Sequence, residues 1–177
     1  MVGVWAASVG TADLLLTTTV PPIDAMAIYA ADYTDPVTSL TDTEFTSFTD
    51  SATAVELDVD DMNTAQPVGK LYTYSNRRVY RVEITATPLS SAAGGSTNYI
   101  DYTVSGGKNV DLDDTTYSTH GAETANPASV FYAKSAASAG AEMGANGQLI
   151  SVKIDTDYST VAAGGYNGAI TFNYIAE

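Results

Sequence analysis

The fold class of this chain is decided by one alternating stretch, Val79-Tyr80-Arg81-Val82-Glu83-Ile84-Thr85-Ala86. Its even-numbered residues are apolar or aromatic, while Arg81, Glu83 and Thr85 between them are polar. A period of two is typical of a β-strand that buries one face and exposes the other. The stretch therefore predicts a half-buried strand.

The same alternation recurs from the beginning to the end of the chain. It is found at residues 14–20, Val55–Asp60, Ile100–Val104, Ile150–Asp155 and Ile170–Tyr174. Repeated half-buried strands with turn residues between them favour an antiparallel β-sandwich with one wet face on each sheet. Residues 120–145 are rich in Ala, Ser and Gly, and are expected to form a long surface loop with one helical turn near residues 133–143. The prediction is one all-β domain.

Composition limits the possible functions. The 177 residues include 21 acidic and 7 basic side chains, giving a formal net charge of −14. A surface with this much negative charge repels nucleic acid and anionic lipid, and neither is therefore an expected partner. The chain has no cysteine, which excludes thiol catalysis, Cys-based zinc sites and iron–sulfur clusters. No apolar run approaches the ~20 residues that span a bilayer.

No catalytic site is expected. The single histidine, His120, lies in a Ser/Thr-rich stretch typical of a surface loop. Ser105-Gly106-Gly107-Lys108 has the Ser-x-x-Lys spacing of some penicillin-recognising enzymes, but those place it at the start of a helix. Here the two glycines follow an alternating segment and predict a hairpin turn. The sequence gives no reason to expect an enzyme or a cofactor.

Two polar clusters invite a binding hypothesis. Asp111, Asp113 and Asp114 are the best candidates for calcium, which prefers clustered oxygen ligands, although the glycine and later glutamate of a helical calcium loop are missing. All three arginines fall close together, and the resulting patch comprises Tyr74, Arg77, Arg78, Tyr80 and Arg81. It is either a contact surface for an acidic neighbour or glycan, or a set of internal pairs, since Arg81 and Glu83 share a face. Exposure of Tyr72, Tyr74 and Tyr80 together would favour a binding module.

The two ends of the chain resemble a known family. Leu14-Leu15-Leu16-Thr17-Thr18-Thr19-Val20-Pro21-Pro22-Ile23-Asp24 is similar to the start of mature major pilins of the alpha class of chaperone–usher fimbriae, the colonisation-factor and common-pilus type. The closing stretch 157–172, with its Gly, aromatic, Gly spacing before an alternating strand, resembles their last motif. The lack of cysteine also suits that class. Residues 1–12, uncharged and small, are either the end of a secretory signal or a segment that pairs with another strand.

The resemblance implies an incomplete immunoglobulin-like sandwich, residues 21–177, preceded by an N-terminal extension, residues 1–20. In such pilins the extension of one subunit completes the sheet of the next. The implied donor residues are Leu14, Leu16, Thr18 and Val20, and the implied acceptor groove is lined by Ile170, Phe172 and Tyr174. The implied partners are other copies of the chain, a periplasmic chaperone and an outer-membrane usher, with the fimbria displayed outside the cell for adhesion. A secreted binding module, or a filament or coat protein of another lineage, is the alternative.

Overall fold

The all-β prediction is confirmed. A computed structural model describes residues 17–19, 21, 24–32, 55–61, 63–77, 79–92, 96–109, 112–134 and 148–176. Among these residues the regular elements are ten β-strands and two short 3-10 turns, η1 at Val59–Asp61 and η3 at Tyr158–Thr160. Within the same ranges no helix is long and apolar enough to cross a membrane.

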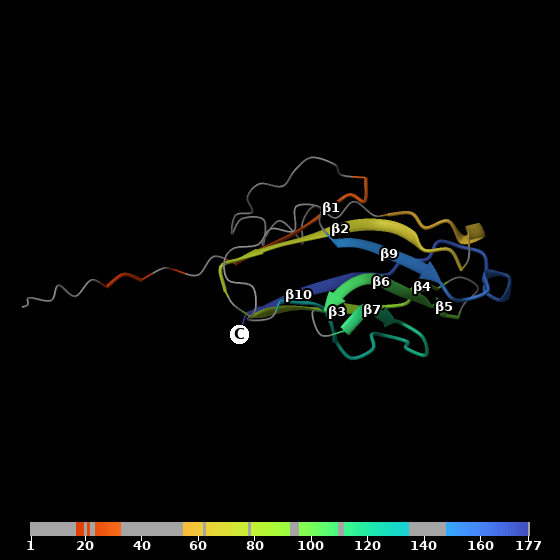
Figure 1. The fold of residues 1–177 in the computed structure, drawn as a ribbon. Helices are drawn as coiled ribbons and strands as arrows, with labels where there is room; N and C mark the ends of the chain where they lie inside the picture. Colours follow the sequence, from red (N-terminus) through yellow and green to blue (C-terminus); the bar gives the residue numbers. More distant parts are fainter. Residues whose placement is uncertain are drawn as a thin grey trace, which may run out of the picture.

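The strands follow one another closely along the chain. They are β1 Asp24–Tyr29, β2 Gln66–Ser75, β3 Tyr80–Ala86, β4 Leu89–Ser91, β5 Asn98–Ile100, β6 Tyr102–Asn109, β7 Leu112–Ser118, β8 Ser129–Lys134, β9 Gln148–Ile154 and β10 Ile170–Ala176. Eight of them form one sheet, in which seven follow the order β1-β2-β9-β6-β8-β3-β10 and β7 pairs with β6 beside this path. Strands β4 and β5 form a separate pair. Figure 1 shows the arrangement as two layers, with β1, β2 and β9 in one and β3 and β10 in the other.

Strand β6 joins the two halves of the sheet. Its first part, Tyr102–Ser105, pairs antiparallel with β9, whereas Lys108 and Asn109 pair parallel with β8. Gly106 stands at the change of partner with φ of 103°, and a Cβ added there would lie 1.8 Å from the Leu149 carbonyl oxygen. The predicted hairpin turn at Gly106–Gly107 is therefore wrong. The missing side chain of Gly106 lets β6 pass close to the backbone of β9, a use of glycine typical of bulged strands.

The core confirms the alternation in three strands. In β3 every second residue from Tyr80 to Ala86 is buried, and β9 buries Ile150, Val152 and Ile154 in the same way. Strand β10 buries Phe172, whose ring meets Phe131 edge-on at a centroid distance of 5.2 Å. The central cluster comprises Met26, Leu71, Val82, Ile84, Ala86, Tyr102, Val104, Tyr117, Phe131, Ile150, Val152 and Phe172.

The predicted strand at Val55–Asp60 is wrong. Val55 is 54% exposed, and the segment runs into the 3-10 turn η1. The Asp60 N–H donates to the Asp58 carboxylate (2.9 Å), and the Asp58 N–H donates to the Gln66 side-chain oxygen (2.8 Å). The backbone N–H groups of Asp58 and Asp60 are therefore bonded to side-chain oxygens. A neighbouring strand would need such N–H groups for its own hydrogen bonds, so these local bonds take the place of strand pairing.

Two further expectations need correction. The loop predicted over residues 120–145 contains strand β8, because Val130-Phe131-Tyr132 places a fully buried Phe131 in the core. The segment Ile100–Val104 is two strands separated at Asp101, although Ile100, Tyr102 and Val104 are all buried as predicted. Of the alternating segment 14–20, only Thr17–Thr19 are described, and they lie outside the strands.

Candidate assembly site

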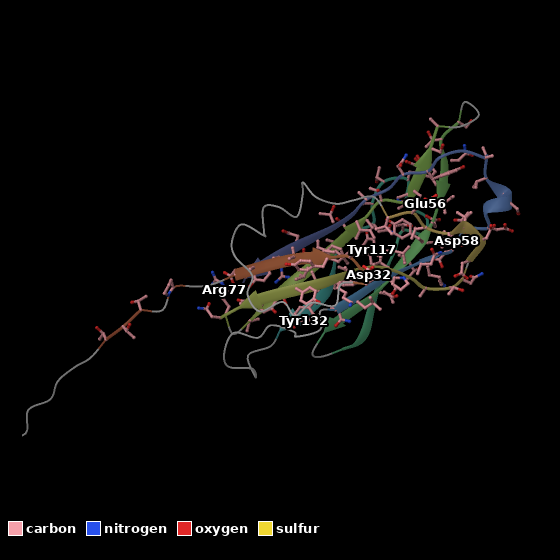
Figure 2. The ribbon with its side chains drawn as sticks, turned by 90° about the horizontal axis from the view of Figure 1, so that it is seen from above. Asp32, Glu56, Asp58, Arg77, Tyr117 and Tyr132 are labelled. Carbon is pink, nitrogen blue, oxygen red and sulfur yellow. The ribbon has the colours of Figure 1, made fainter. Side chains whose placement is uncertain are left out.

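The N-terminal segment meets the sandwich at the corner between β2 and β3. Thr17, Thr18 and Thr19 are exposed, and Figures 1 and 2 both show them projecting beyond the end of the sheets. The carbonyl oxygen of Pro21 accepts a hydrogen bond from the Asn76 side chain (2.9 Å), and β1 begins three residues later. Leu14, Leu16 and Val20, predicted as donor residues, lie outside the described residues. Thr18, the fourth, is exposed.

Strands β1 and β10 stand at the two ends of the strand order. In the described part of the chain, β1 pairs with β2 alone and β10 pairs with β3 alone. The start of β1 and the end of β10 both lie at the β2–β3 corner, because Asp24 pairs with Ser75 and Ala176 pairs with Tyr80. The edges of the two layers thus come together at the place where the N-terminal segment enters.

One carboxylate links these edges. Asp24 Oδ1 accepts hydrogen bonds from the Tyr174 hydroxyl and the Ser75 hydroxyl, each at 2.7 Å, and Asp24 Oδ2 pairs with Arg77 Nε at 2.7 Å. The Arg77 N–H also donates to Ser75 Oγ (3.0 Å). We call Asp24, Ser75, Arg77 and Tyr174 the Asp24 clasp. It spans β1, the β2–β3 corner and β10, and Figure 2 shows Arg77 at this end of the molecule.

Electrostatics favour the charged form of the clasp. Burial acts to raise the pKa of Asp24, but hydrogen bonds from Tyr174, Arg77 and Ser75 outweigh it, so the pKa lies below its ordinary value of 3.8. Burial raises the pKa of the Tyr174 hydroxyl, and its hydrogen bond to Asp24 raises it further. Tyr174 therefore stays protonated and donates, while Asp24 stays ionised and accepts.

The predicted acceptor residues share one face of β10. Phe172 is buried, and Ile170 and Tyr174 are partly buried against the core cluster. The Tyr174 ring stacks on Tyr80 with a centroid distance of 5.0 Å. The intervening Thr171 and Asn173 are exposed on the other face. The prediction that Ile170, Phe172 and Tyr174 share one face of a strand is confirmed. All three side chains pack against the core of the chain to which they belong.

Among the described members of the predicted basic and aromatic patch, Tyr80 is buried and does not belong to a contact surface. Tyr80 is 1% exposed and Tyr72 is 3% exposed, so neither can contact a ligand from solvent. Arg77 belongs to the clasp, and Arg81 Nε pairs with Glu83 at 2.9 Å as the internal-pair alternative expected. Arg78 lies outside the described residues, and for Tyr74 only the backbone is described. The alternation of β3 places the Tyr80 side chain in the core, even though the arginines nearby in the sequence suggested a surface patch.

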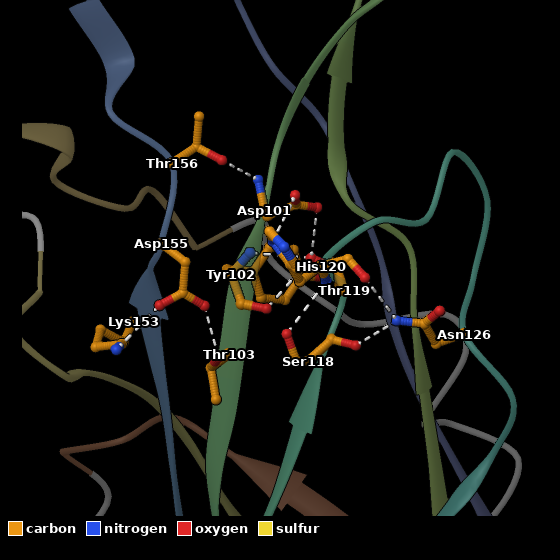
Figure 3. A network of polar contacts seen from close by, with 10 residues as sticks. All are labelled: Asp101, Tyr102, Thr103, Ser118, Thr119, His120, Asn126, Lys153, Asp155 and Thr156. Atoms are coloured by element: carbon orange, nitrogen blue, oxygen red, sulfur yellow. Dashed lines mark hydrogen bonds and ion pairs between the residues drawn. The ribbon is translucent and has the colours of Figure 1, made fainter.

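The opposite end of the sandwich carries a second polar network, which the sequence did not reveal (Figure 3). The buried Thr119 hydroxyl accepts the Tyr102 N–H (2.9 Å), and the Thr156 hydroxyl accepts the Asp101 N–H (2.8 Å). His120 Nδ1 lies 3.4 Å from Asp101 Oδ2, with the His120 side chain 83% exposed. No local pattern marks Thr119 or Thr156, because each satisfies a backbone group far away in the sequence.

The remaining candidates are placed as follows. Ser105 to Lys108 lie within strand β6, in a setting unlike the helix start that a Ser-x-x-Lys catalytic motif requires. Asp111 lies outside the described residues, and for Asp113 and Asp114 only the backbone of β7 is described. Among the described residues no group of three or more His, Asp or Glu side chains is arranged to hold a metal ion.

Searches of protein-family models, characterised proteins and solved structures give no match to this chain. Its function must therefore be inferred from its own geometry, and the best-defined geometry outside the core is the meeting of β1, β10 and the N-terminal segment.

Proposed function

We propose that this chain is a structural subunit of an extracellular fibre, a pilin-like protein that assembles with copies of itself by strand donation. Residues from the N-terminal segment of one copy would pair with the edge of β10 in the next. The assembled fibre would serve adhesion, and the chain itself would carry no catalytic activity. Before assembly the subunit would be held in the periplasm by a chaperone and delivered to an outer-membrane usher, as the resemblance to alpha-class pilins implies.

One observation carries the proposal. The strand order ends on β1 and β10, and both edges come together at the corner from which exposed Thr17–Thr19 project away from the domain. Sheet edges readily accept a strand from another chain. A projecting Thr-rich segment flanked by Leu16 and Val20 has the β-propensity and alternation that such a strand needs.

The sandwich also supports the structural interpretation over a binding module. The tyrosines that would have formed a glycan platform, Tyr72 and Tyr80, are buried. Tyr80 instead stacks against Tyr174 and donates or accepts a hydrogen bond with Thr73 (2.7 Å). The large aromatic side chains of these strands stabilise the fold.

The test compares the full chain with a version lacking residues 1–20, by size-exclusion chromatography and negative-stain electron microscopy. We expect fibres or oligomer ladders from the full chain only. A full chain carrying Leu16→Asp should lose fibres in the same way, because a charge at an inward position of a paired strand is costly. The matched control is Thr17→Asp, on the opposite face of the same segment, which should still assemble.

Stable, discrete monomers from both the full and shortened chains, with identical unfolding, would contradict strand donation. Calcium and glycan binding would then be measured next, as the alternative of a secreted binding module requires.

A further inference from the structure

The segment Val55–Asp58 has no strand partner among the described residues. Val55 is 54% exposed and Glu56 is exposed, while Leu57 packs against the core cluster. Within the described part of the chain, no hydrogen bond is made by the backbone of Val55, Glu56 or Leu57. The segment therefore has open backbone groups together with the alternation that is typical of a strand.

The Gln66 side chain holds one end of this segment. Its amide oxygen accepts the Asp58 N–H (2.8 Å), and its amide nitrogen donates to the Asp58 carbonyl oxygen (2.7 Å). Both backbone groups of Asp58 are thus bonded on one side, as they are in a paired strand. In an extended chain the backbone groups of successive residues point to opposite sides, so those of Leu57 are directed away from Gln66. That side can accept a strand.

This open edge and the projecting N-terminal segment belong to opposite ends of the molecule. Asp58 lies beside Gln66, the first residue of β2, whereas Asp24 pairs with Ser75, the last. Nine residue steps of about 3.3 Å separate the two ends of β2 by about 30 Å. Six steps from Thr18 to Asp24 span at most about 22 Å. Thr18 therefore cannot reach Asp58 of its own chain, and Figure 2 shows Asp58 at the far end.

Charge favours an uncharged strand at this edge. Glu56 and Asp58 are both exposed, and a spacing of two residues places them on one face of an extended segment. Two such segments paired with each other would place carboxylates opposite carboxylates, which is destabilising. Thr17–Thr19 are exposed and uncharged, and threonine has a high β-propensity. They can pair where a second acidic segment is repelled.

We propose that Val55–Leu57 is an acceptor edge that pairs with Thr17–Thr19 of a second copy of the chain. The two copies are arranged end to end, with the β2–β3 corner of one beside the Gln66 end of the next. Such a contact joins two different surfaces, so it repeats along a filament and does not close a dimer. The inference rests on the proposed function and names a second acceptor for the same donor segment, in addition to β10.

The absence of cysteine from the chain allows a test by disulfide formation. A chain carrying Thr17→Cys or Thr18→Cys is mixed with a tagged chain carrying one acceptor cysteine. The acceptor is Glu56→Cys, Asn173→Cys on β10, or Glu123→Cys, all at exposed positions. After oxidation the mixed products are separated by gel electrophoresis, and circular dichroism checks that each variant is folded. Glu123 lies outside both edges, so its product gives the background.

We expect Glu56→Cys to give at least about five times the background with one of the two donors, because a disulfide needs Cβ atoms within about 4.5 Å. Only one donor should react strongly, since Thr17 and Thr18 point to opposite faces of a paired strand. Equal yields from both donors would show a contact without strand pairing and would overturn the inference.

A backbone variant tests the pairing separately. Val55→Pro removes an N–H on the same side as that of Leu57, so the Glu56→Cys product should fall to the background. Val55→Thr keeps this N–H and the β-propensity, and serves as the matched control with an unchanged yield. An unchanged yield in Val55→Pro would contradict pairing through the backbone.

The two acceptors separate this inference from the proposed function. Product above the background at Asn173 but not at Glu56 would overturn the inference and leave donation to β10 intact. Product at Glu56 alone would support the inference and remove β10 as the acceptor. Background yields at both positions would overturn the inference and the proposed function together.

Discussion

The two ends of this sandwich are held by different polar chemistry. At the β2–β3 corner, the charged Asp24 carboxylate gathers Ser75, Arg77 and Tyr174. At the opposite end, the neutral hydroxyls of Thr119 and Thr156 accept backbone N–H groups, and the Asp101–His120 and Lys153–Asp155 pairs lie in the same network (Figure 3). Thr119 is fully buried, whereas the Asp24 side chain is 21% exposed.

The difference shows which end responds to solvent conditions. A buried hydroxyl that satisfies a backbone N–H has the same role at every pH in which the protein folds. A clasp built on one ionised carboxylate weakens when that carboxylate is protonated. We call the end that carries the Asp24 clasp the conditional end. We call the end that carries the Thr119 and Thr156 hydroxyls the invariant end.

The largest expected effect comes from Gly106, in the strand that pairs with both β9 and β8. Gly106→Val should destabilise the protein by more than about 3 kcal/mol, because φ of 103° disfavours a side chain and its Cβ would overlap the Leu149 carbonyl. Urea unfolding followed by circular dichroism measures this. Gly165→Ala, where an added Cβ meets nothing within 4 Å, is the control and should be nearly neutral. Equal effects at the two glycines would contradict the close approach of β6 to β9.

The invariant end should lose about 2 kcal/mol in Thr119→Val, since the Tyr102 N–H would remain buried without its acceptor. The shape of the side chain is kept, so the loss reports the hydrogen bond. Most of the loss should persist from pH 7 to pH 3.5, because the hydroxyl that accepts the Tyr102 N–H is neutral, although the same hydroxyl also donates to the Asp101 carboxylate (3.3 Å). Thr116→Val, at an exposed position of β7, serves as the control and should change the free energy of unfolding little. A strongly pH-dependent loss at Thr119 would erase the distinction between the two ends.

At the conditional end, Asp24→Asn should lower the free energy of unfolding by about 1 kcal/mol at pH 7. The pKa of Asp24 is lowered in the folded protein, so its contribution is complete above the ordinary value of 3.8. That contribution disappears as the pH falls below 3.8 and through the lower folded-state pKa. The wild type and Asp24→Asn should therefore converge in acid, as measured by chemical unfolding at a series of pH values.

Two further variants isolate the clasp in that experiment. Tyr174→Phe removes one donor, and its effect should be much smaller in the Asp24→Asn background, which is the signature of direct coupling. Asp60→Asn, in the exposed turn η1, removes one carboxylate away from the clasp and is the control for the change in net charge. A parallel offset between wild type and Asp24→Asn at every pH would show that the charge of Asp24 is irrelevant.

The smallest effect is expected at His120. His120→Ala should change stability by less than about 0.5 kcal/mol, because the imidazole is 83% exposed and an exposed ion pair contributes little. Thermal unfolding at pH 5 and pH 7 tests this. A large loss confined to pH 5 would mean that the Asp101–His120 contact makes this end conditional as well.

The sequence by itself determined the class of fold. Strands β3, β9 and β10 could be located from alternation, because a strand with one buried face must place apolar side chains at every second residue. The shared face of Ile170, Phe172 and Tyr174 followed from the same rule. The inward position of Tyr80 also follows from it, although the nearby arginines favoured a surface patch.

Only the tertiary structure decided which alternating segments found a partner and which distant residues meet. Val55–Asp60 alternates as cleanly as β3, yet it forms no strand, because alternation reports an apolar face and says nothing about a neighbouring backbone. Asp24 and Tyr174 are 150 residues apart, and no local pattern predicts that they meet. Their contact exists because β1 and β10 end at one corner, and strand order is a property of the whole chain.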